Sequence, residues 1–171
     1  MSVTTVLGFD VGARRIGIAV GNCISMSARE VGVLDVFDNQ VDWASLNRWI
    51  KEWMPQALVV GDPQTLDGGD QASRQRARKF AIEIGKRYQL PGEQIDGRNS
   101  SLEAAQRFAE ARRAGTKKRH QAANLDALAA VIIVERWLNE PGARTLVDNA
   151  ASQSSSANSS PSNPASGVEP L

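Results

Sequence analysis

The chain has 171 residues and a mass of 18.4 kDa, which fits one domain because domains commonly span roughly 100–200 residues. Hydrophobic residues make up 42% and charged residues 23%, a balance typical of a globular chain and not of a disordered one. No apolar run reaches the roughly 20 residues of a membrane-spanning helix, and residues 1–5 lack the features of a secretory signal. A single cysteine, Cys23, excludes an internal disulfide. We therefore expect a cytoplasmic protein without membrane contact.

The net charge of +1 hides an uneven distribution of charge. Residues 1–70 hold five Lys/Arg against nine Asp/Glu, whereas residues 71–120 hold thirteen Lys/Arg against five Asp/Glu. The basic part is typical of a surface that binds a polyanion, with acidic residues placed elsewhere for another purpose. Two helices with solvated charged faces explain the same split, and composition alone favours that plainer interpretation.

The first third of the chain has the alternation of strands. Residues 3–10, 15–20 and 30–37 are β-rich and separated by short turns, which predicts an antiparallel meander. Tryptophans then follow helical spacing over 43–53, and Pro55 ends that helix. We interpret these tryptophans as packing residues and not as platforms for nucleobases.

Strands and helices alternate in the rest of the chain. A continuous apolar run at 57–61 is typical of a strand covered on both faces. Ser100 and Glu103 have the spacing of a capping box at the start of a helix. The predicted elements are a strand at 57–61, a helix at 72–88, a strand at 93–96, and helices at 100–113 and 125–138. The order β-β-β-α-β-α-β-α-α predicts a single α/β domain with a five-stranded mixed sheet, antiparallel in its first three strands and extended by parallel ones, flanked by helices.

The end of the chain has a different composition. From about residue 150 it is rich in Ser, Asn and Pro, with no periodic apolar residues and one charge, Glu169. Such a segment cannot bury enough apolar surface to offset its ordering entropy. We therefore expect a folded domain over 1–140 and a disordered tail over 141–171.

Asp10 is the first candidate for chemistry. It ends the first strand between Gly8 and Gly12, where a phosphate or a hydrated metal can approach the backbone. A turn aspartate explains the same position. Residues 12–17 are not a nucleotide phosphate loop, because Ile18 stands where that motif requires Lys. An ATPase of the actin or sugar-kinase type, which also has an Asp-x-Gly turn, needs two such domains.

Asp126 and Asp96 are the other two candidates. Asp126 heads an apolar stripe on the last helix, which directs it toward the sheet, where it needs a cation or a donor; an aspartate serving its own helix N-terminus is the alternative. Asp96 ends the strand at 93–96. If these strand ends share one edge, Asp10, Asp96 and Asp126 converge as catalytic residues and ligands of Mg²⁺ or Mn²⁺. Such a cluster supports phosphodiester hydrolysis.

Six segments of the chain resemble the YqgF family. They are residues 7–21, 59–63, 66–68, 74–80, 96–104 and 125–133, so the resemblance covers 4–139 in order. The resemblance implies an RNase H-like fold and Asp10 and Asp126 as metal ligands. It also implies a metal-dependent nuclease, either one that processes the 5′ end of precursor 16S rRNA in ribosome biogenesis or a Holliday junction resolvase. The expected partner is structured RNA or branched DNA, and the expected state a monomer or weak homodimer.

The chain departs from the family pattern at two positions. The family's Asp-Glu-Arg reads Asp96-Gly97-Arg98 here, and Asp62 stands where the family has Leu. Either Asp96 turns inward, or Asp62 compensates, or the site has lost a carboxylate. The last possibility leaves open a nucleic-acid-binding protein with weakened or no catalysis.

Basic residues supply candidate phosphate contacts that would not distinguish between bases. Affinity through such contacts falls steeply with salt. The loop 114–120 is the candidate for a mobile substrate clamp. The candidate nucleic-acid-binding residues are Arg14, Arg15, Arg74, Arg78, Arg98, Lys117, Lys118 and Arg119.

Overall fold

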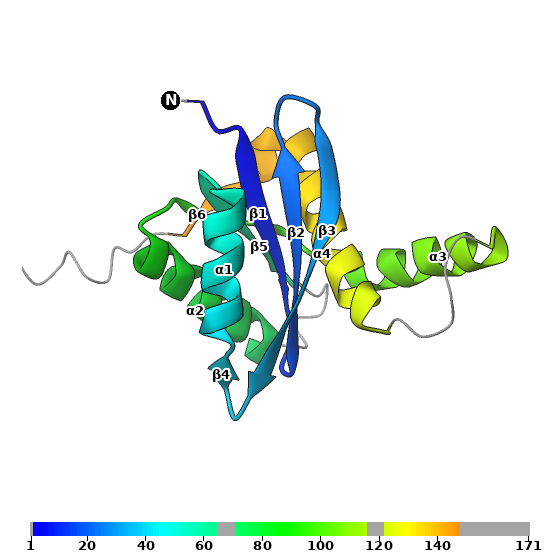
Figure 1. The fold of residues 1–171 in the computed structure, drawn as a ribbon, viewed down its shortest axis with the longest axis horizontal. Coiled ribbons are helices and arrows are strands. Elements are labelled where there is room, and N and C mark those ends of the chain that lie inside the picture. Colours follow the sequence, from blue (N-terminus) through cyan, green and yellow to red (C-terminus); the bar gives the residue numbers. More distant parts are fainter. Residues whose placement is uncertain (1, 65–70, 116–121, 148–171) are drawn as a thin grey trace, which may run out of the picture.

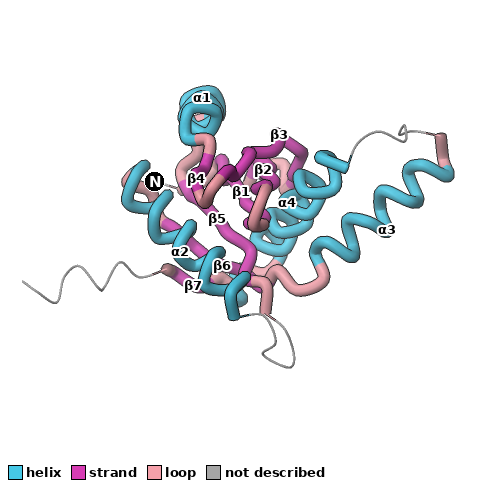
Figure 2. The backbone as a smooth tube through the Cα atoms, turned by 90° about the horizontal axis from the view of Figure 1, so that it is seen from below, coloured by secondary structure: helices cyan, strands magenta, loops and turns pink. Residues whose placement is uncertain are grey.

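The computed structural model describes residues 2–64, 71–115 and 122–147, which form three layers with a mixed sheet in the middle (Figures 1 and 2). The strands are β1 (Thr5–Val11), β2 (Arg15–Asn22), β3 (Ser27–Phe37), β4 (Gln40–Val41), β5 (Ala57–Asp62), β6 (Gly92–Asp96) and β7 (Thr145–Leu146). The helices are α1 (Trp43–Trp53), α2 (Gln71–Tyr88), α3 (Ser100–Arg113) and α4 (Ala122–Asn139), followed by a short 3-10 turn (Pro141–Ala143). Among these described helices, none is both long enough and apolar enough to cross a membrane.

The sheet runs in the order β4-β3-β2-β1-β5-β6-β7. As predicted, β1, β2 and β3 are antiparallel, and β5 and β6 extend the sheet in parallel from β1. The prediction of five strands is wrong, because the described residues form seven. The two additional strands are β4, which pairs with the end of β3, and β7, which pairs with β6. Each has two residues, too few to show an alternating pattern in the sequence.

The ordered chain also continues past residue 140. The turn at Pro141–Ala143 leads into β7, and the backbone N–H of Val147 donates to the carbonyl of Gly92 at 2.9 Å. The rest of the predicted tail, residues 148–171, lies outside the described residues.

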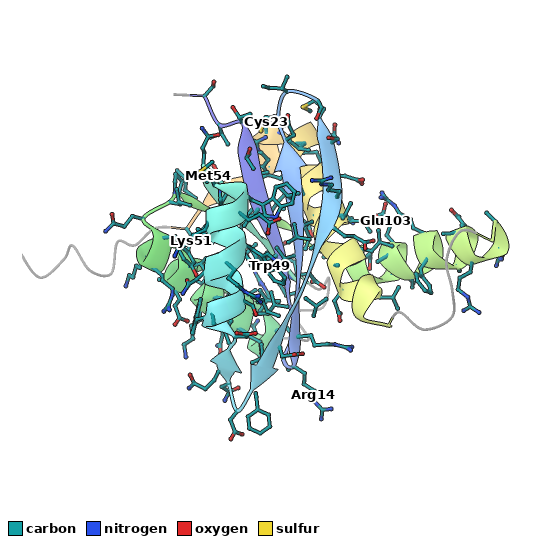
Figure 3. The ribbon with its side chains drawn as sticks, viewed as in Figure 1. Arg14, Cys23, Trp49, Lys51, Met54 and Glu103 are labelled. Atoms are coloured by element: carbon teal, nitrogen blue, oxygen red, sulfur yellow. The ribbon has the colours of Figure 1, made fainter. Side chains whose placement is uncertain are left out.

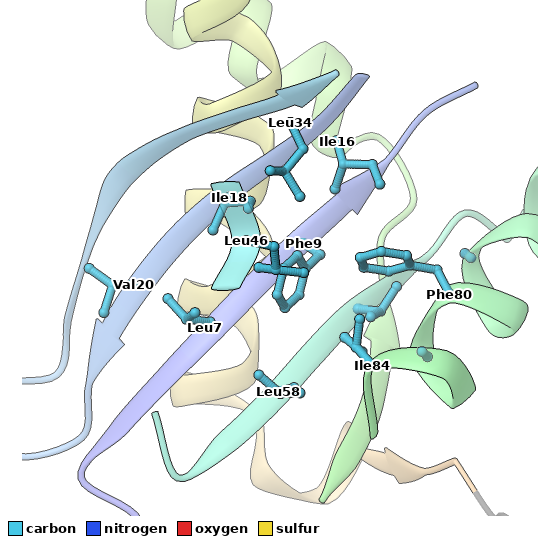
Figure 4. Packing of buried hydrophobic residues seen from close by; sticks show 13 residues of the cluster. Leu7, Phe9, Ile16, Ile18, Val20, Leu34, Leu46, Leu58, Phe80 and Ile84 are labelled. Atoms are coloured by element: carbon cyan, nitrogen blue, oxygen red, sulfur yellow. The ribbon is translucent and has the colours of Figure 1, made fainter. Parts of the chain in front are cut away.

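Each face of the sheet has its own hydrophobic core. Alternate residues of β1 divide between them: Leu7 and Phe9 pack with α1 and α2, whereas Val6 packs with α4. Figure 4 shows the first core, where Phe9 meets Phe80 of α2 edge to face with ring centroids 5.3 Å apart. The tryptophans of α1 pack against this core, as predicted, and Trp49 lies between its helix and the sheet (Figure 3).

The predicted capping box at α3 does not form. Asn99 is the N-cap, in the left-handed conformation, and its side chain makes no capping hydrogen bond. Glu103 instead forms ion pairs with Arg107 and Arg136, each at 3.1 Å. The Glu103 carboxylate therefore pairs with one arginine of its own helix and one of α4, and it does not cap the start of α3. Beyond its contact with α4, helix α3 projects from the body of the protein (Figure 1).

Helix α4 packs close against the sheet because the residues beneath it are glycines, which have no side chain to hold it away. An added Cβ at Gly8 or Gly21 would overlap Val134, and one at Gly61 would overlap Ile133. At Gly17 the obstacle would be backbone, since a Cβ there would coincide with the carbonyl of Asp126. We call Gly8, Gly17, Gly21 and Gly61 the glycine seam. It sets the height of α4 above the sheet.

We predict that Gly17→Ala destabilises the fold and moves the start of α4 away from β2. The helix backbone cannot yield as a flexible side chain does, so we expect a loss of about 1–3 kcal/mol, the usual range for overpacking. Gly142→Ala is the matched control, because nothing lies within 4 Å of a Cβ at that position. Urea unfolding of both variants measures the difference, and equal stabilities would contradict the close packing at Gly17.

Candidate active site

Asp10 and Asp126 meet at the carboxyl end of β1. Asp10 pairs with Gly17 across the β1–β2 ladder. The start of α4 rests on that glycine, so the fold places Asp126 beside Asp10. The apolar stripe that follows on α4 is buried as the sequence predicted, with Ala130 and Ile133 fully enclosed. Two carboxylates from opposite ends of the chain therefore share one partly buried position.

The protonation of Asp10 is strongly affected by this position. Burial raises the pKa of Asp10 from 3.8 to about 6, and the negative charge of Asp126 adds to the rise. With a pKa of about 6, this carboxyl group changes its charge just below neutral pH, and a bound cation would favour its ionised form. Perturbed pKa values of this kind cluster at functional sites.

Asp126 is only partly satisfied. The Nε atom of Arg15 lies 3.0 Å from its Oδ2 atom, close enough for an ion pair. That oxygen is nevertheless inaccessible to solvent and accepts no well-oriented hydrogen bond in the part of the chain that the structure describes. Because buried polar atoms are nearly always hydrogen-bonded, an acceptor left over here indicates a place for a cation or a donor.

Asp96 does not join this pair. Strand alternation explains why: Ile95 packs in the core under α4, so the next side chain, Asp96, points to the other face. There it binds the Arg98 guanidinium, whose Nη2 atom donates to Asp96 Oδ2 at 2.7 Å. Partial burial alone would raise the pKa of Asp96, but hydrogen bonds from the side chain and backbone of Arg98 outweigh it and hold that pKa below its usual value.

The predicted convergence of three carboxylates is therefore not observed. Across residues 2–64, 71–115 and 122–147, no three His, Cys, Asp or Glu side chains are grouped so as to hold a metal. Asp62 does not fill the third place either. It pairs in register with Asp96 on the α2 side of the sheet and binds the Arg74 guanidinium through contacts of 3.1 and 3.3 Å.

Gly97 stands at the vacant third position of the family pattern. Its N–H donates to the carbonyl of Asp62 at 2.8 Å. A Cβ on Gly97 would lie 3.2 Å from the Cα of Gly61, which follows Val60, the residue that pairs with Phe9 across the β1–β5 ladder. The side chain that the family carries here would thus start toward β5, against the backbone of Gly61 and Asp62.

Arg136 was not singled out by sequence reasoning, although it fixes this part of the site. Its Nη1 atom donates to the carbonyls of Asp96 at 3.0 Å and of Arg98 at 2.8 Å. Its Nη2 atom donates to Glu103. The signal in the sequence was a lone arginine at the end of an otherwise apolar stretch of helix. Through it, α4 holds the backbone on both sides of Gly97.

The predicted phosphate contacts fall into three groups. Arg15, Arg74 and Arg98 are paired with Asp126, Asp62 and Asp96. Arg14 and Arg78 are exposed and form no ion pair within the described residues, and Arg14 extends outward from the β1–β2 turn (Figure 3). Lys117, Lys118 and Arg119 lie outside the described residues.

The fold is similar to that of a solved structure. The structure titled "T. thermophilus RuvC in complex with Holliday junction substrate" superposes with a TM-score of 0.50 at 16% identity, covering 84% of this chain and 99% of that one. At this identity the likeness concerns the fold alone. The fold is that of the RuvC-like, RNase H-type class. In this chain the carboxylate pair stands at the end of β1.

Within this class, residues 4–140 match the family model described as "RuvX: Holliday junction resolvase", and the chain belongs to the RuvX family. This confirms the YqgF resemblance. A protein of Xanthomonas campestris pv. campestris (strain 8004) is 57% identical over 143 residues, 84% of this chain and 92% of the relative. One of Xylella fastidiosa (strain M23) is 54% identical over 136 residues, 80% and 88% of the two chains. Both carry the name "Putative pre-16S rRNA nuclease". These names are those of nucleases, which are phosphodiester hydrolases.

We predict that Asp10→Asn stabilises the protein at neutral pH. The pKa of Asp10 is higher in the folded chain than in the unfolded one, so the carboxylate costs stability as pH rises from about 4 through about 6. At 1.36 kcal/mol per pKa unit, the variant should gain at most about 3 kcal/mol above pH 7 and nothing below pH 4.

Asp96→Asn is the opposite case. The pKa of Asp96 is lowered by folding, so its carboxylate stabilises the fold above the pKa of the unfolded chain, and this contribution fades as pH falls. The variant should therefore lose stability at pH 7. Urea unfolding in EDTA at pH 4 and pH 8 tests both variants, and a shift of the same sign at pH 8 would refute the assignment of the two environments.

Proposed function

We propose that this protein is a metal-dependent nuclease of the cytoplasm that hydrolyses phosphodiester bonds at the 5′ end of precursor 16S rRNA. The observation that carries the proposal is the pair Asp10 and Asp126. The buried Oδ2 atom of Asp126 has an ion pair with Arg15 but no well-oriented hydrogen bond in the described chain, and the neighbouring Asp10 carboxyl group has a pKa of about 6. The names of relatives with more than half of their residues identical support the choice of RNA substrate.

The donor set fits Mg²⁺ or Mn²⁺. Both ions prefer oxygen ligands, and Mg²⁺ sites in nucleases commonly use one or two carboxylates together with substrate phosphates. Asp10 and Asp126 would hold the ion, and the unsatisfied Oδ2 atom is the acceptor that such an ion would complete. A bound ion of this kind supplies a water of lowered pKa and stabilises charge on the phosphate.

The chain's own residues have distinct parts in this mechanism. Asp10 must lose its proton before it can bind a cation, so binding weakens below about pH 6. Arg15 balances part of the charge of Asp126 before substrate arrives. Arg14 and Arg78 are exposed, and we propose that they contact phosphates of the backbone without reading its bases. Lys117, Lys118 and Arg119 extend this set as a proposal from the sequence.

A second candidate is a nucleic-acid-binding protein with weakened catalysis. The specific observation in its favour is Gly97, which leaves the described site with two carboxylates where the family has a further one. Branched DNA is the alternative substrate for either candidate, since the matching family model names a Holliday junction resolvase.

We predict that Asp10→Asn abolishes divalent-dependent cleavage while the protein stays folded. The substrates are a precursor 16S rRNA fragment and a four-way DNA junction, each incubated with Mg²⁺, Mn²⁺ or EDTA. Asp38→Asn is the matched control, because it makes the same chemical change at an exposed hairpin position. Cleavage of the RNA alone supports the proposed substrate. Equal cleavage by Asp10→Asn and the unaltered protein would remove Asp10 from the site.

We also predict that Gly97→Glu tightens Mn²⁺ binding and raises the cleavage rate. The backbone at Gly97 is not in the left-handed region, so a larger residue is not strained, and its Cβ needs only a small shift of Gly61 and Asp62. Gly97→Gln matches the size without the charge and should gain neither property. If the two variants behave alike, position 97 does not contribute a ligand.

A further inference from the structure

A second feature lies on the opposite face of the sheet from Asp126, at the same end of β1. It is a cavity of about 360 Å³ between the sheet and α2. Val11, Ile16 and Phe80 form its apolar floor, with Ile16 supplied by the sheet and Phe80 by α2 (Figure 4). Gln75, Arg76 and Lys79 form its polar rim. We call this space the β1–α2 cavity.

The cavity is adjacent to the carboxylate pair through the backbone of β1. Asp10 and Val11 are consecutive, so their side chains leave the strand on opposite faces. The turn that follows is tight, with the N–H of Gly12 donating to the carbonyl of Arg15 at 2.9 Å. Gly12 itself lines the cavity and has no side chain to block its edge. A chain molecule held at Asp10 therefore reaches the cavity by passing over one strand end.

The lining indicates the chemistry of the occupant. The volume lies within the roughly 300–1,000 Å³ of small-ligand pockets, which combine apolar walls with a few polar groups. An apolar floor suits a flat, uncharged ring. The amide of Gln75 suits the edge of a base, since Gln side chains make such contacts.

The cations on the rim are available for a phosphate. Neither Arg76 nor Lys79 forms an ion pair within the described part of the chain. Glu83 also lines the cavity and is exposed, so its charge disfavours a phosphate at its own part of the rim and favours one beside Arg76 and Lys79. A neutral base inside and its phosphate at the rim satisfy both conditions.

We propose that the β1–α2 cavity takes an unpaired nucleobase of the nucleic-acid substrate, next to the phosphate that a metal ion on Asp10 and Asp126 would bind. The proposal rests on the nuclease function proposed above and adds a substrate requirement to it. The requirement is an unpaired nucleotide beside the cleaved bond, because a base inside a duplex cannot enter the cavity.

The test is an abasic scan of the bound RNA. Synthetic RNAs that span the mature 5′ end of 16S rRNA carry one abasic nucleotide each, and their binding to the full chain is measured by fluorescence anisotropy with Ca²⁺, which also takes oxygen ligands, in place of Mg²⁺. We expect one position at which loss of the base weakens binding about tenfold, the size expected for removing one buried base. An effect spread evenly over all positions would overturn the proposal.

Variants of the rim connect that position to the cavity. Ala72 is exposed and lines the cavity, so Ala72→Trp should fill it without disturbing the core. We expect this variant to bind the intact RNA more weakly and to bind the intact and abasic RNAs equally. Gln75→Trp is a second filling variant. Ala105→Trp, on the exposed side of α3, is the matched control and should retain the full difference.

The outcomes separate the two proposals. Cleavage that depends on Asp10, together with an abasic effect that survives both filling variants, overturns the cavity assignment and leaves the nuclease assignment standing. Absence of both RNA binding and cleavage in the unaltered protein overturns both. An abasic effect lost in the filling variants and kept in Ala105→Trp supports the cavity.

Discussion

The close approach of α4 to the sheet is the constraint on which the rest of this structure depends. A helix packed over ordinary side chains would stand higher, and its first turn would lie away from the end of β1. The glycine seam removes that obstacle at four points, so the backbone of Asp126 touches Gly17. The second core and the carboxylate pair both follow from this contact. At this end of the molecule, the glycines that allow α4 to pack on the sheet also place Asp126 beside Asp10.

The carboxylate pair lowers the stability of the folded chain when Asp10 is ionised. Two acidic groups share a position with little water, and the nearby Arg15 compensates only one of them. Three other acidic residues of the described chain are well satisfied: Asp62, Asp96 and Glu103 each bind an arginine. Natural proteins concentrate such unfavourable arrangements where function requires them. The contrast between these three acids and the pair Asp10 and Asp126 therefore supports the proposal that the pair is the functional one.

Most of the fold was predictable because its elements are long and periodic. The apolar stripe of α4 even predicted that Asp126 faces the sheet, and burial of Ala130 and Ile133 confirms it. β4 and β7 could not be predicted, because their two residues show no strand pattern of their own. They are strands only through their pairing with β3 and β6. The capping box does not form because Glu103 pairs with Arg107, four residues along the helix, and with Arg136, which is remote in sequence.

Asp96 shows a different limit. Its place at a strand end correctly indicated the edge of the sheet, but not the face. The face depends on parity: Ile95 occupies the inward position, so the carboxylate one residue later points outward. That parity is visible in the sequence only if the core partner of Ile95 is known. Arg136 was equally hidden, since its acceptors are carbonyls.

The arrangement around Arg136 has a consequence for how this family can evolve. Asp126 and Arg136 stand ten residues apart on one helix, so a rigid rod of about 15 Å separates the carboxylate from the 96–98 backbone. Hydrogen bonds from Arg136, and from Gly97 to Asp62, hold that backbone without any side chain at position 97. The conformation of this backbone therefore does not depend on an acidic side chain at position 97. Lineages can lose or regain this acid by a single substitution, while selection on the fold keeps the rest of the architecture intact.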